Sequence, residues 1–332
     1  MAEESPLNNK LELHYFFSED DKTHSMDAVT RNKCEHEILQ IVEEISKELE
    51  IRVKVETEAY KEGGLKEFWT FLSTDNGQLT LLLSLITLAL SRIPLRKSKL
   101  EKEDLKLSVE ERKLNIELLK KELENKGIQE PTINFEKINL IINNNIKIIK
   151  HKSNFYKHLY NYPKVKKIST TRLNQQKEKT EEPIFVERKD FDKFILENDN
   201  LESVTDDLAT IEIISPVLKK GKFKWKGIYD KLGVPIEFSM KDKDFKEDVI
   251  KDGIPFKSGT FIDCVLEIAR KVDDLGNIFN SNYSVLTVLR QHDEGTSFET
   301  PQGKKYRKQK EAEKQQLNLF DNTDRKNEKP ST

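Results

Sequence analysis

Residues 70–91 read TFLSTDNGQLTLLLSLITLALS, the one strongly apolar stretch of the chain. Small residues recur in it at alternating steps of three and four, the spacing that keeps side chains on one face of a helix. Leucine and isoleucine occupy most of the other positions of its second half. The place of this stretch in the folded protein decides the architecture. The small residues, called the seam below, are Thr70, Ser73, Gly77, Thr80, Ser84, Thr87 and Ser91.

The apolar stretch is close to the length of a membrane span. Residues 76–91 carry no charge, and a helix needs about 20 residues to cross a bilayer, with a lower limit near 17. Counting back to Phe68 includes Asp75 as the only charge. Trp69 would then lie at one interface and Arg92 at the other. The sequence therefore predicts a transmembrane segment within residues 65–95, as a single span or a re-entrant segment.

The seam has two functional interpretations in lipid. Small residues let membrane helices approach closely and form cross-helix hydrogen bonds, which predicts a homo-oligomer. Hydroxyl groups can also line a narrow pore, which predicts a channel. A third interpretation is structural: an apolar helix buried in the core of a soluble oligomer.

The composition restricts the classes of protein and partner. The chain has 332 residues, a net charge of −2, 35% charged and 36% apolar residues. The low net charge gives no global field for an acidic partner or nucleic acid. The core is lean for this length, so we expect extended or disordered parts. Two distant cysteines suit a reducing compartment. We expect a bacterial inner-membrane protein with most of the chain in the cytoplasm, or alternatively a cytoplasmic protein.

The local patterns predict an α+β fold. Alternating apolar residues in 11–17 and 51–60 indicate strands around a helix that runs from residue 27 to 49, so residues 1–64 form a small α/β unit. Residues 96–182 form a charged, basic helical connector, with a possible coiled-coil face at Val109, Ile116 and Leu123. Residues 183–292 contain strand-like runs punctuated by glycine and form a β-rich domain. Residues 293–332 are predicted to be a disordered tail.

A basic and aromatic block lies in the connector. Its residues could neutralise phosphates and stack bases, or lie against anionic lipid. A plain solvated helix is the alternative. The candidate residues for nucleic-acid or lipid binding are Lys147, Lys150, Lys152, Tyr156, Lys157, Tyr160, Lys164, Lys166, Lys167 and Arg172.

The tail contains the pentapeptide QLNLF. Gln316, Leu317, Leu319 and Phe320 resemble the bacterial sliding-clamp-binding motif, in which a glutamine leads and the apolar residues enter a pocket. A disordered tail that carries such anchors into a preformed groove is a known mode of recognition. A short helix packed on the protein's own surface is the alternative interpretation.

Motifs of common enzyme classes are absent. The chain has no GxSxG, P-loop or HExxH sequence, and no GxGxxG after a strand. The sequence therefore predicts a non-enzymatic protein without catalytic, cofactor-binding or metal-binding residues.

The stretch KFKWKGIYDKLGVPIEFSMKDKDFKEDVIKDGIPFKSGTFIDCVLEI, near residues 222–268, resembles a C-terminal module of uncharacterised bacterial membrane proteins. The layout of the chain is similar to that of anti-phage membrane effectors, in particular the Hailong effector family. That family pairs a membrane channel with a nucleotidyltransferase whose DNA oligomer restrains the channel. The resemblance implies an oligomeric effector with a ligand-responsive cytosolic part.

Two functional hypotheses follow. The first is a membrane-associated, oligomeric effector or regulatory protein of bacterial phage defence that can form a channel, and whose β-rich domain senses a nucleotide, an oligonucleotide or a protein partner. The second is a soluble nucleic-acid accessory protein that a sliding clamp recruits through the tail.

Overall fold

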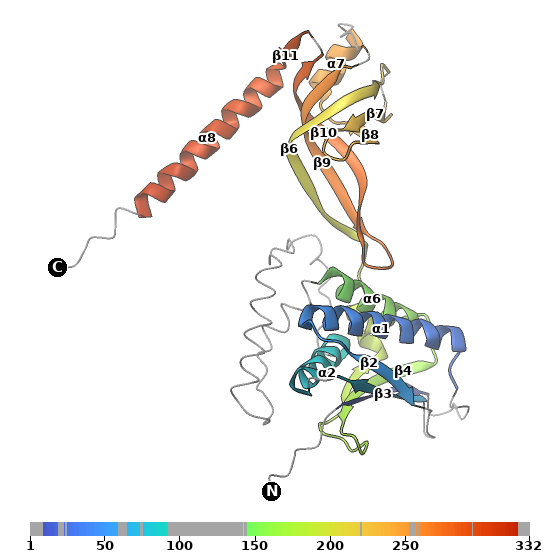
Figure 1. The fold of residues 1–332 in the computed structure, drawn as a ribbon. Helices are drawn as coiled ribbons and strands as arrows, with labels where there is room; N and C mark the ends of the chain where they lie inside the picture. Colours follow the sequence, from blue (N-terminus) through green and yellow to red (C-terminus); the bar gives the residue numbers. More distant parts are fainter. Residues whose placement is uncertain are drawn as a thin grey trace, which may run out of the picture. The chain divides into compact units, whose positions relative to one another are not determined.

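The computed structural model describes residues 9–18, 23, 25–58, 65–73, 76–91, 142, 145–219, 221–251, 257, 259–293 and 295–324. The chain divides into two compact units (Figure 1). Unit 1 comprises Met1–Asn200 and Val272–Ile278, and unit 2 comprises Leu201–Lys271 and Phe279–Thr332. The fold is α+β, with one sheet built mainly from each unit. The possible coiled-coil face at Val109, Ile116 and Leu123 lies outside the described residues.

Unit 1 is built on a five-stranded sheet in the order β2-β3-β1-β4-β5. Each of its neighbouring pairs is antiparallel. Along the chain, β1, α1, β2, β3, α2 and β4 occur in the order of a ferredoxin-like sandwich, with α6 inserted between α2 and β4, and β5 extends the β4 edge. The strands are β1 (Lys10–Phe17), β2 (Lys54–Glu58), β3 (Leu65–Leu72), β4 (Val165–Leu173) and β5 (Ile184–Glu187).

The helices of unit 1 pack on the apolar face of this sheet. Helix α1 (Ala28–Leu49) begins where the Asp27 carboxylate accepts a hydrogen bond from the Thr30 N–H. Its buried stripe includes Ile38, Ile41 and Ile45. Helices α2 (Asn76–Ser91) and α6 (Ile146–Tyr160) and the 3-10 helix η1 (Arg188–Phe194) contribute to the same core.

The prediction of a transmembrane helix is wrong. Helix α2 has 16 residues, and its leucines and isoleucine, except the partly buried Leu88, are buried in the core of unit 1. Within the described ranges, no helix is both long and apolar enough to cross a membrane. Among the described helices, α2 is the apolar one that lies at the centre of unit 1, where most of its surface is covered. The interpretation as a buried core helix therefore describes α2 better than the interpretation as a membrane span.

The seam packs inside unit 1 instead of forming one continuous helical face. Thr70 belongs to β3 and Ser73 follows it, so only the residues from Gly77 onward lie in α2. Thr80 accepts a hydrogen bond from the Ser84 hydroxyl through its carbonyl, at 2.9 Å. The Arg172 guanidinium of β4 donates to the Ser84 oxygen at 2.8 Å. Small side chains thus let α2 lie close to β4.

The far end of the seam meets the same strand. The hydroxyls of Ser91 and Thr170 are hydrogen-bonded at 2.5 Å. Thr87, one turn before Ser91, is buried as well. These contacts of Ser84 and Ser91 join α2 to β4 of the same chain.

Unit 2 contains a closed five-stranded barrel. The ring runs β10-β8-β7-β6-β9 and closes by pairing of β9 with β10, while β11 adds to the β10 edge. The pairs β6–β7 and β7–β8 are antiparallel, whereas β8–β10 is parallel. The strands are β6 (Asn200–Ser215), β7 (Trp225–Tyr229), β8 (Val234–Met240), β9 (Phe261–Val272), β10 (Ile278–His292) and β11 (Ser297–Glu299).

A short helix, α7 (Lys243–Lys251), lies between the third and fourth barrel strands. Trp225, Phe238 and Phe245 fill the core of the barrel. At Gly227, a Cβ atom would lie 2.5 Å from the Ile211 side chain and 2.6 Å from a backbone oxygen, so only glycine allows β6 and β7 to approach this closely.

The prediction of a disordered tail over residues 293–332 is also wrong for its described part. Helix α8 (Pro301–Asp324) follows β11. The Thr300 hydroxyl accepts a hydrogen bond from the Gly303 N–H at 2.9 Å and caps the helix. A Cβ atom at Gly303 would lie 2.2 Å from the Leu289 carbonyl oxygen, so the helix begins directly against β10. Apolar periodicity did not predict this helix, because Thr300, Gln302 and Gly303 attach it to the barrel instead of an apolar face.

The predicted domain layout is corrected in two further respects. The strand-helix-strand segment of residues 1–64 does not form a unit of its own, because β1 pairs with β3 and β4 from later in the chain. The predicted helical connector ends in strand β4, and β5 completes the sheet of unit 1 instead of starting the β-rich domain. Pairing between strands distant in sequence decides both points.

Candidate functional site

The basic block predicted in the connector lies in α6, in β4 and between them, and part of it faces inward. Lys150 forms ion pairs with Asp199 at 2.7 Å and Asp274 at 3.2 Å. Lys152 is fully buried, and burial lowers the pKa of its ammonium to about 7. The helical period that gathers lysines in sequence also turns some of them toward the core.

Two other members of the block serve packing within unit 1. The buried Tyr156 hydroxyl donates a hydrogen bond to the Leu90 carbonyl at the end of α2. Arg172, besides its bond to Ser84, forms an ion pair with Glu181 at 2.6 Å. Neither side chain is positioned to bind an external phosphate.

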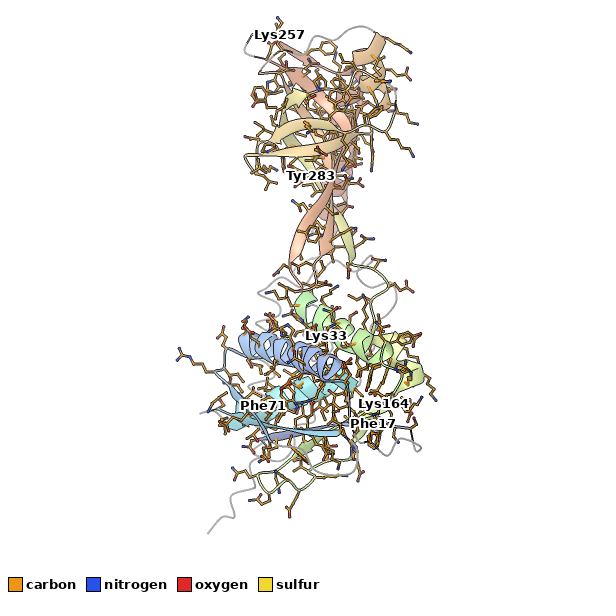
Figure 2. The ribbon with its side chains drawn as sticks, turned by 90° about the vertical axis from the view of Figure 1, so that its right-hand side faces the viewer. Phe17, Lys33, Phe71, Lys164, Lys257 and Tyr283 are labelled. Carbon is orange, nitrogen blue, oxygen red and sulfur yellow. The ribbon has the colours of Figure 1, made fainter. Side chains whose placement is uncertain are left out.

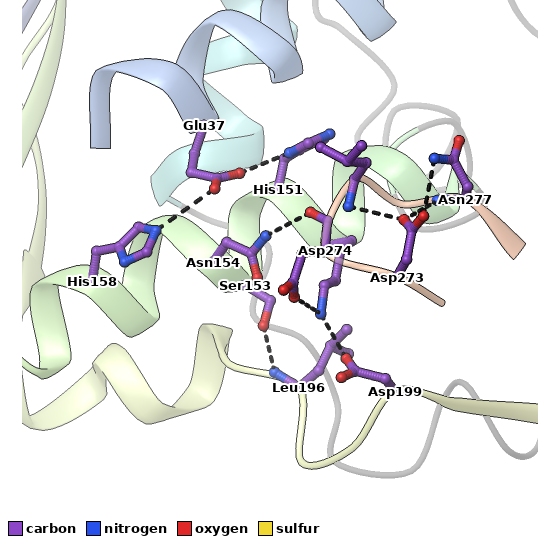
Figure 3. A network of polar contacts seen from close by, with 12 residues as sticks. Glu37, His151, Ser153, Asn154, His158, Leu196, Asp199, Asp273, Asp274 and Asn277 are labelled. Atoms are coloured by element: carbon purple, nitrogen blue, oxygen red, sulfur yellow. Dashed lines mark hydrogen bonds and ion pairs between the residues drawn. The ribbon is translucent and has the colours of Figure 1, made fainter. Parts of the chain in front are cut away.

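A network of polar contacts joins α6 to the segments around it (Figure 3). Glu37 of α1 lies 2.7 Å from His151 Nδ1 and 3.6 Å from His158 Nε2. Burial alone would raise the pKa of Glu37, but the contacts with the two histidines lower it to about 2. The network therefore holds α1 to α6 through a carboxylate that stays ionised near neutral pH.

The same network fastens two segments to α6. The Leu196 N–H donates to the Ser153 hydroxyl at 2.9 Å, and the Asn154 amide donates to the Asp274 carbonyl at 3.1 Å (Figure 3). Asp273 closes its own turn by accepting bonds from Leu275 and Asn277. In the described part of the chain, no group of histidine, cysteine, aspartate and glutamate side chains is arranged to hold a metal ion. The contacts of this network indicate a structural role.

The remaining members of the block lie nearer the surface of unit 1. Lys157 and Lys166 are exposed, and Lys147 lies 3.6 Å from Glu44 in an ion pair. Half-exposed Tyr160 packs against the Arg188 guanidinium. Lys164 and Lys167 lie over phenylalanine rings. The predicted block is thus not one continuous surface.

The barrel of unit 2 has the connectivity of the oligonucleotide/oligosaccharide-binding (OB) fold. Its first three strands form a meander, a helix precedes the fourth strand, and the third and fifth strands pair in parallel. In this fold, ligands bind on the second and third strands and on the loops beside them. These correspond here to β7, β8 and the β6–β7 loop.

The β6–β7 loop enters β7 through the sequence KKGKFKWK, residues 219–226, which we call the lysine loop. Lys219, Lys222, Lys224 and Lys226 are exposed. Lys226 lies 3.3 Å from Glu237 of β8 in an ion pair. Among the described residues, no ion pair is found for the other three. The exposed side chains of Lys219, Lys222 and Lys224 give this loop a positive surface.

One aromatic ring is exposed among these lysines. Phe223 has 53% of its surface exposed. Gly221, at φ +143°, makes room for it, since a Cβ atom there would lie 2.7 Å from the ring. The Lys246 ammonium of α7 donates to the Gly221 carbonyl at 2.7 Å and holds the turn. The Phe223 ring thus packs against Gly221, whose position the hydrogen bond from Lys246 fixes.

The alternation of β7 explains why sequence analysis missed this loop. Trp225 points into the barrel, where its ring centroid lies 6.2 Å from that of Phe238. Its neighbours Lys224 and Lys226 therefore point outward. The signal was available in KFKWK, where lysines alternate with aromatic residues, but the run was interpreted only as a strand.

The clamp-like pentapeptide lies in helix α8. Gln316, Leu317, Leu319 and Phe320 fall within the helical backbone, which is not the extended tail that the motif interpretation assumed. Their side chains lie outside the described part, so clamp binding stays a prediction.

No family model, curated protein or solved structure matches this chain.

Proposed function

We propose that the barrel of unit 2 binds single-stranded nucleic acid through the lysine loop. The observation that carries this proposal is the exposed Phe223 ring flanked by Lys222 and Lys224. Single-strand-binding proteins combine positive charge, which neutralises phosphates, with aromatic rings on which bases stack. The OB-type connectivity alone would not suffice, because one fold can serve many functions.

The loop favours a single strand over a duplex. An aromatic side chain contributes affinity by stacking only when the face of a base is free, which pairing and stacking prevent in a duplex. The lysines alone would bind either form, since contacts to phosphates carry no sequence information. Preference for single strands therefore depends on Phe223.

This proposal develops the second of the two sequence hypotheses. The membrane-effector hypothesis depended on residues 76–91 lying in lipid, and those residues form α2 in the core of unit 1. Recruitment by a sliding clamp remains a separate prediction, which a pull-down with Leu317→Ala and Phe320→Ala can test.

The test is fluorescence anisotropy of the full chain with a labelled oligothymidine of about 16 nucleotides. We expect Phe223→Ala to weaken binding roughly 5- to 150-fold, the effect of losing one stacked base. We expect Lys222→Glu with Lys224→Glu to weaken it further and to reduce its salt dependence.

The matched control is Lys33→Glu with Lys189→Glu, which makes the same charge change at exposed positions of unit 1. It should leave affinity nearly unchanged. Equal losses in the loop and control variants would show a general charge effect, and tight binding by Phe223→Ala and by the loop double variant would contradict the proposal. Preference for a duplex over oligothymidine would also contradict it.

A further inference from the structure

The outer surface of β7 and β8, which we call the β7–β8 face, is where an OB fold usually carries its ligand. Tyr229 of β7 and Phe238 of β8 belong to the barrel core, so the side chains that alternate with theirs point outward. None of these outward side chains is an aromatic ring on which a base could stack. They are Lys226, Ile228, Pro235, Glu237 and Ser239.

The strand beside β8 adds no ring to this face. Tyr283 of β10 (Figure 2) pairs with Phe238 in a parallel register, so both side chains point to the same side of the sheet. The Tyr283 ring centroid lies 6.4 Å from that of Tyr229, and the ring packs against the barrel core. The ring that can stack on a base is therefore Phe223 of the lysine loop.

The lysines of β7, of β8 and of the residues that follow each strand are paired with carboxylates. Residues 225–241 contain three lysines. Their ion pairs are Lys226 with Glu237 at 3.3 Å, Lys231 with Asp206 at 2.7 Å and Lys241 with Glu267 at 2.5 Å. Such surface pairs contribute little to stability, but each cancels a positive charge that would attract a phosphate. The lysine loop differs, because its described lysines have no such partner.

One carboxylate of the β7–β8 face is left without a cation. Glu212 of β6 stands opposite Ile228. The residues before and after Glu212 belong to the barrel core, so its carboxylate points outward. Within the described ranges, no lysine or arginine forms an ion pair with Glu212. Since Lys226 balances Glu237, the face keeps an excess of negative charge, which repels phosphates.

We infer that the barrel takes a short single-stranded segment at the lysine loop, and that Glu212 and Glu237 keep the strand off the β7–β8 face. This inference rests on the proposed function and defines its ligand more narrowly. OB folds bind about 4–16 nucleotides. One exposed ring with Lys219, Lys222 and Lys224 around it corresponds to the lower end of that range, because a longer path over the barrel meets neutralised lysines and a carboxylate.

The first test compares oligothymidines of about 6 and about 16 nucleotides by fluorescence anisotropy of the full chain. We expect the longer one to bind less than about tenfold more tightly, because a site of about four nucleotides gains only additional registers on it. A strand that stacked further bases beyond the loop would gain roughly 5- to 150-fold for each of them. A gain larger than the expected one would overturn the inference.

The second test uses two lysines that are two positions apart. Lys224→Ala should weaken binding of the longer oligothymidine, whereas Lys226→Ala should change it by less than about twofold, because Glu237 already neutralises Lys226. Glu237→Gln should strengthen binding roughly two- to fivefold, and adding Lys226→Ala should remove that gain. Glu202→Gln, which makes the same charge change at an exposed position of β6, is the control and should give no gain.

The outcomes separate this inference from the proposed function. Binding that requires Phe223, but that Lys226→Ala weakens as much as Lys224→Ala does, overturns the short site and leaves the proposed function standing. Equal affinities of Glu237→Gln and Glu202→Gln also overturn the inference, because Glu237 would then not keep the strand away. No binding of oligothymidine by the intact chain overturns the proposed function, and this inference with it.

Discussion

Two lysine-rich segments of this protein differ in how far their lysines are exposed to solvent. The α6–β4 segment turns Lys150 and Lys152 inward, one into an ion-pair network and one into full burial. The lysine loop of the barrel leaves Lys222 and Lys224 in solvent around the exposed Phe223 ring. The two segments look alike in sequence. Their difference teaches that the density of charge in a sequence does not tell which charges a ligand can reach.

The difference has a physical cause in the local conformation. A helix that packs on both a sheet and other helices exposes little of its circumference, so α6 buries some of its lysines. The lysine loop leaves residues 221–224 exposed, and burial of alternate residues begins only with Trp225, where the loop enters strand β7. Variants at a position in unit 1 and at one in or beside the lysine loop should therefore differ in stability and in binding.

The largest expected effect concerns the buried lysine. Burial lowers the pKa of Lys152 to about 7 in the folded protein, from its ordinary value of 10.5. Between these values the unfolded chain binds a proton that the folded chain does not, so the free energy of unfolding rises with pH across this window. Lys152→Met should remove that rise. At pH values below the window, it should raise the free energy of unfolding by at most about 5 kcal/mol.

Urea denaturation across that pH range measures this effect. Lys222→Met, at an exposed position of the lysine loop, is the control and should keep the pH dependence of the parent protein. If Lys152→Met retains the rise in stability with pH, then Lys152 is not held in the desolvated site that the structure describes.

A smaller effect compares leucines in the two regions. Leu85 of α2 is fully buried, whereas Leu218, next to the lysine loop, has 64% of its surface exposed. Leu85→Ala should lower the free energy of unfolding by about 2–5 kcal/mol, because it leaves a cavity in the core. Leu218→Ala should change it by less than about 0.5 kcal/mol. Equal midpoints of denaturation for the two variants would contradict the placement of α2.

The smallest effect concerns the salt dependence of binding. Lys224→Ala should reduce the slope of log affinity against log salt by about 0.7, the value for one phosphate contact with a single strand. Lys150→Ala should leave the slope unchanged, because Asp199 and Asp274 already neutralise that ammonium. Anisotropy titrations at several salt concentrations measure both slopes. A reduction in Lys150→Ala alone would reverse the comparison.

Local periodicity predicted several elements well. The alternation of residues 11–17 corresponds to β1, and the apolar stripe from residue 27 to 49 corresponds to α1, where Asp27 provides the cap. These patterns depend on contacts between residues a few positions apart, which a sequence displays directly.

Periodicity did not predict which elements become neighbours. The lysine loop was not chosen as a candidate site because its sequence was interpreted only as a strand, and the pairing of β8 with β10 that places it on a barrel joins segments distant in sequence. Helix α8 was missed because its attachment depends on a close approach of Gly303 to Leu289. Neither feature leaves a local periodic signal, since strand pairing joins segments distant in sequence and the start of α8 depends on one glycine.

The sequence by itself determined that residues 76–91 form an apolar helix with small residues along one side. Only the tertiary structure decided what those small residues meet: Ser84 and Ser91 contact Arg172 and Thr170 of β4. A helix of this composition is covered equally well by lipid, by a second copy or by its own chain. Unit 1 covers it because its sheet, α1 and α6 together leave a space at the centre that no other described helix is apolar enough to fill.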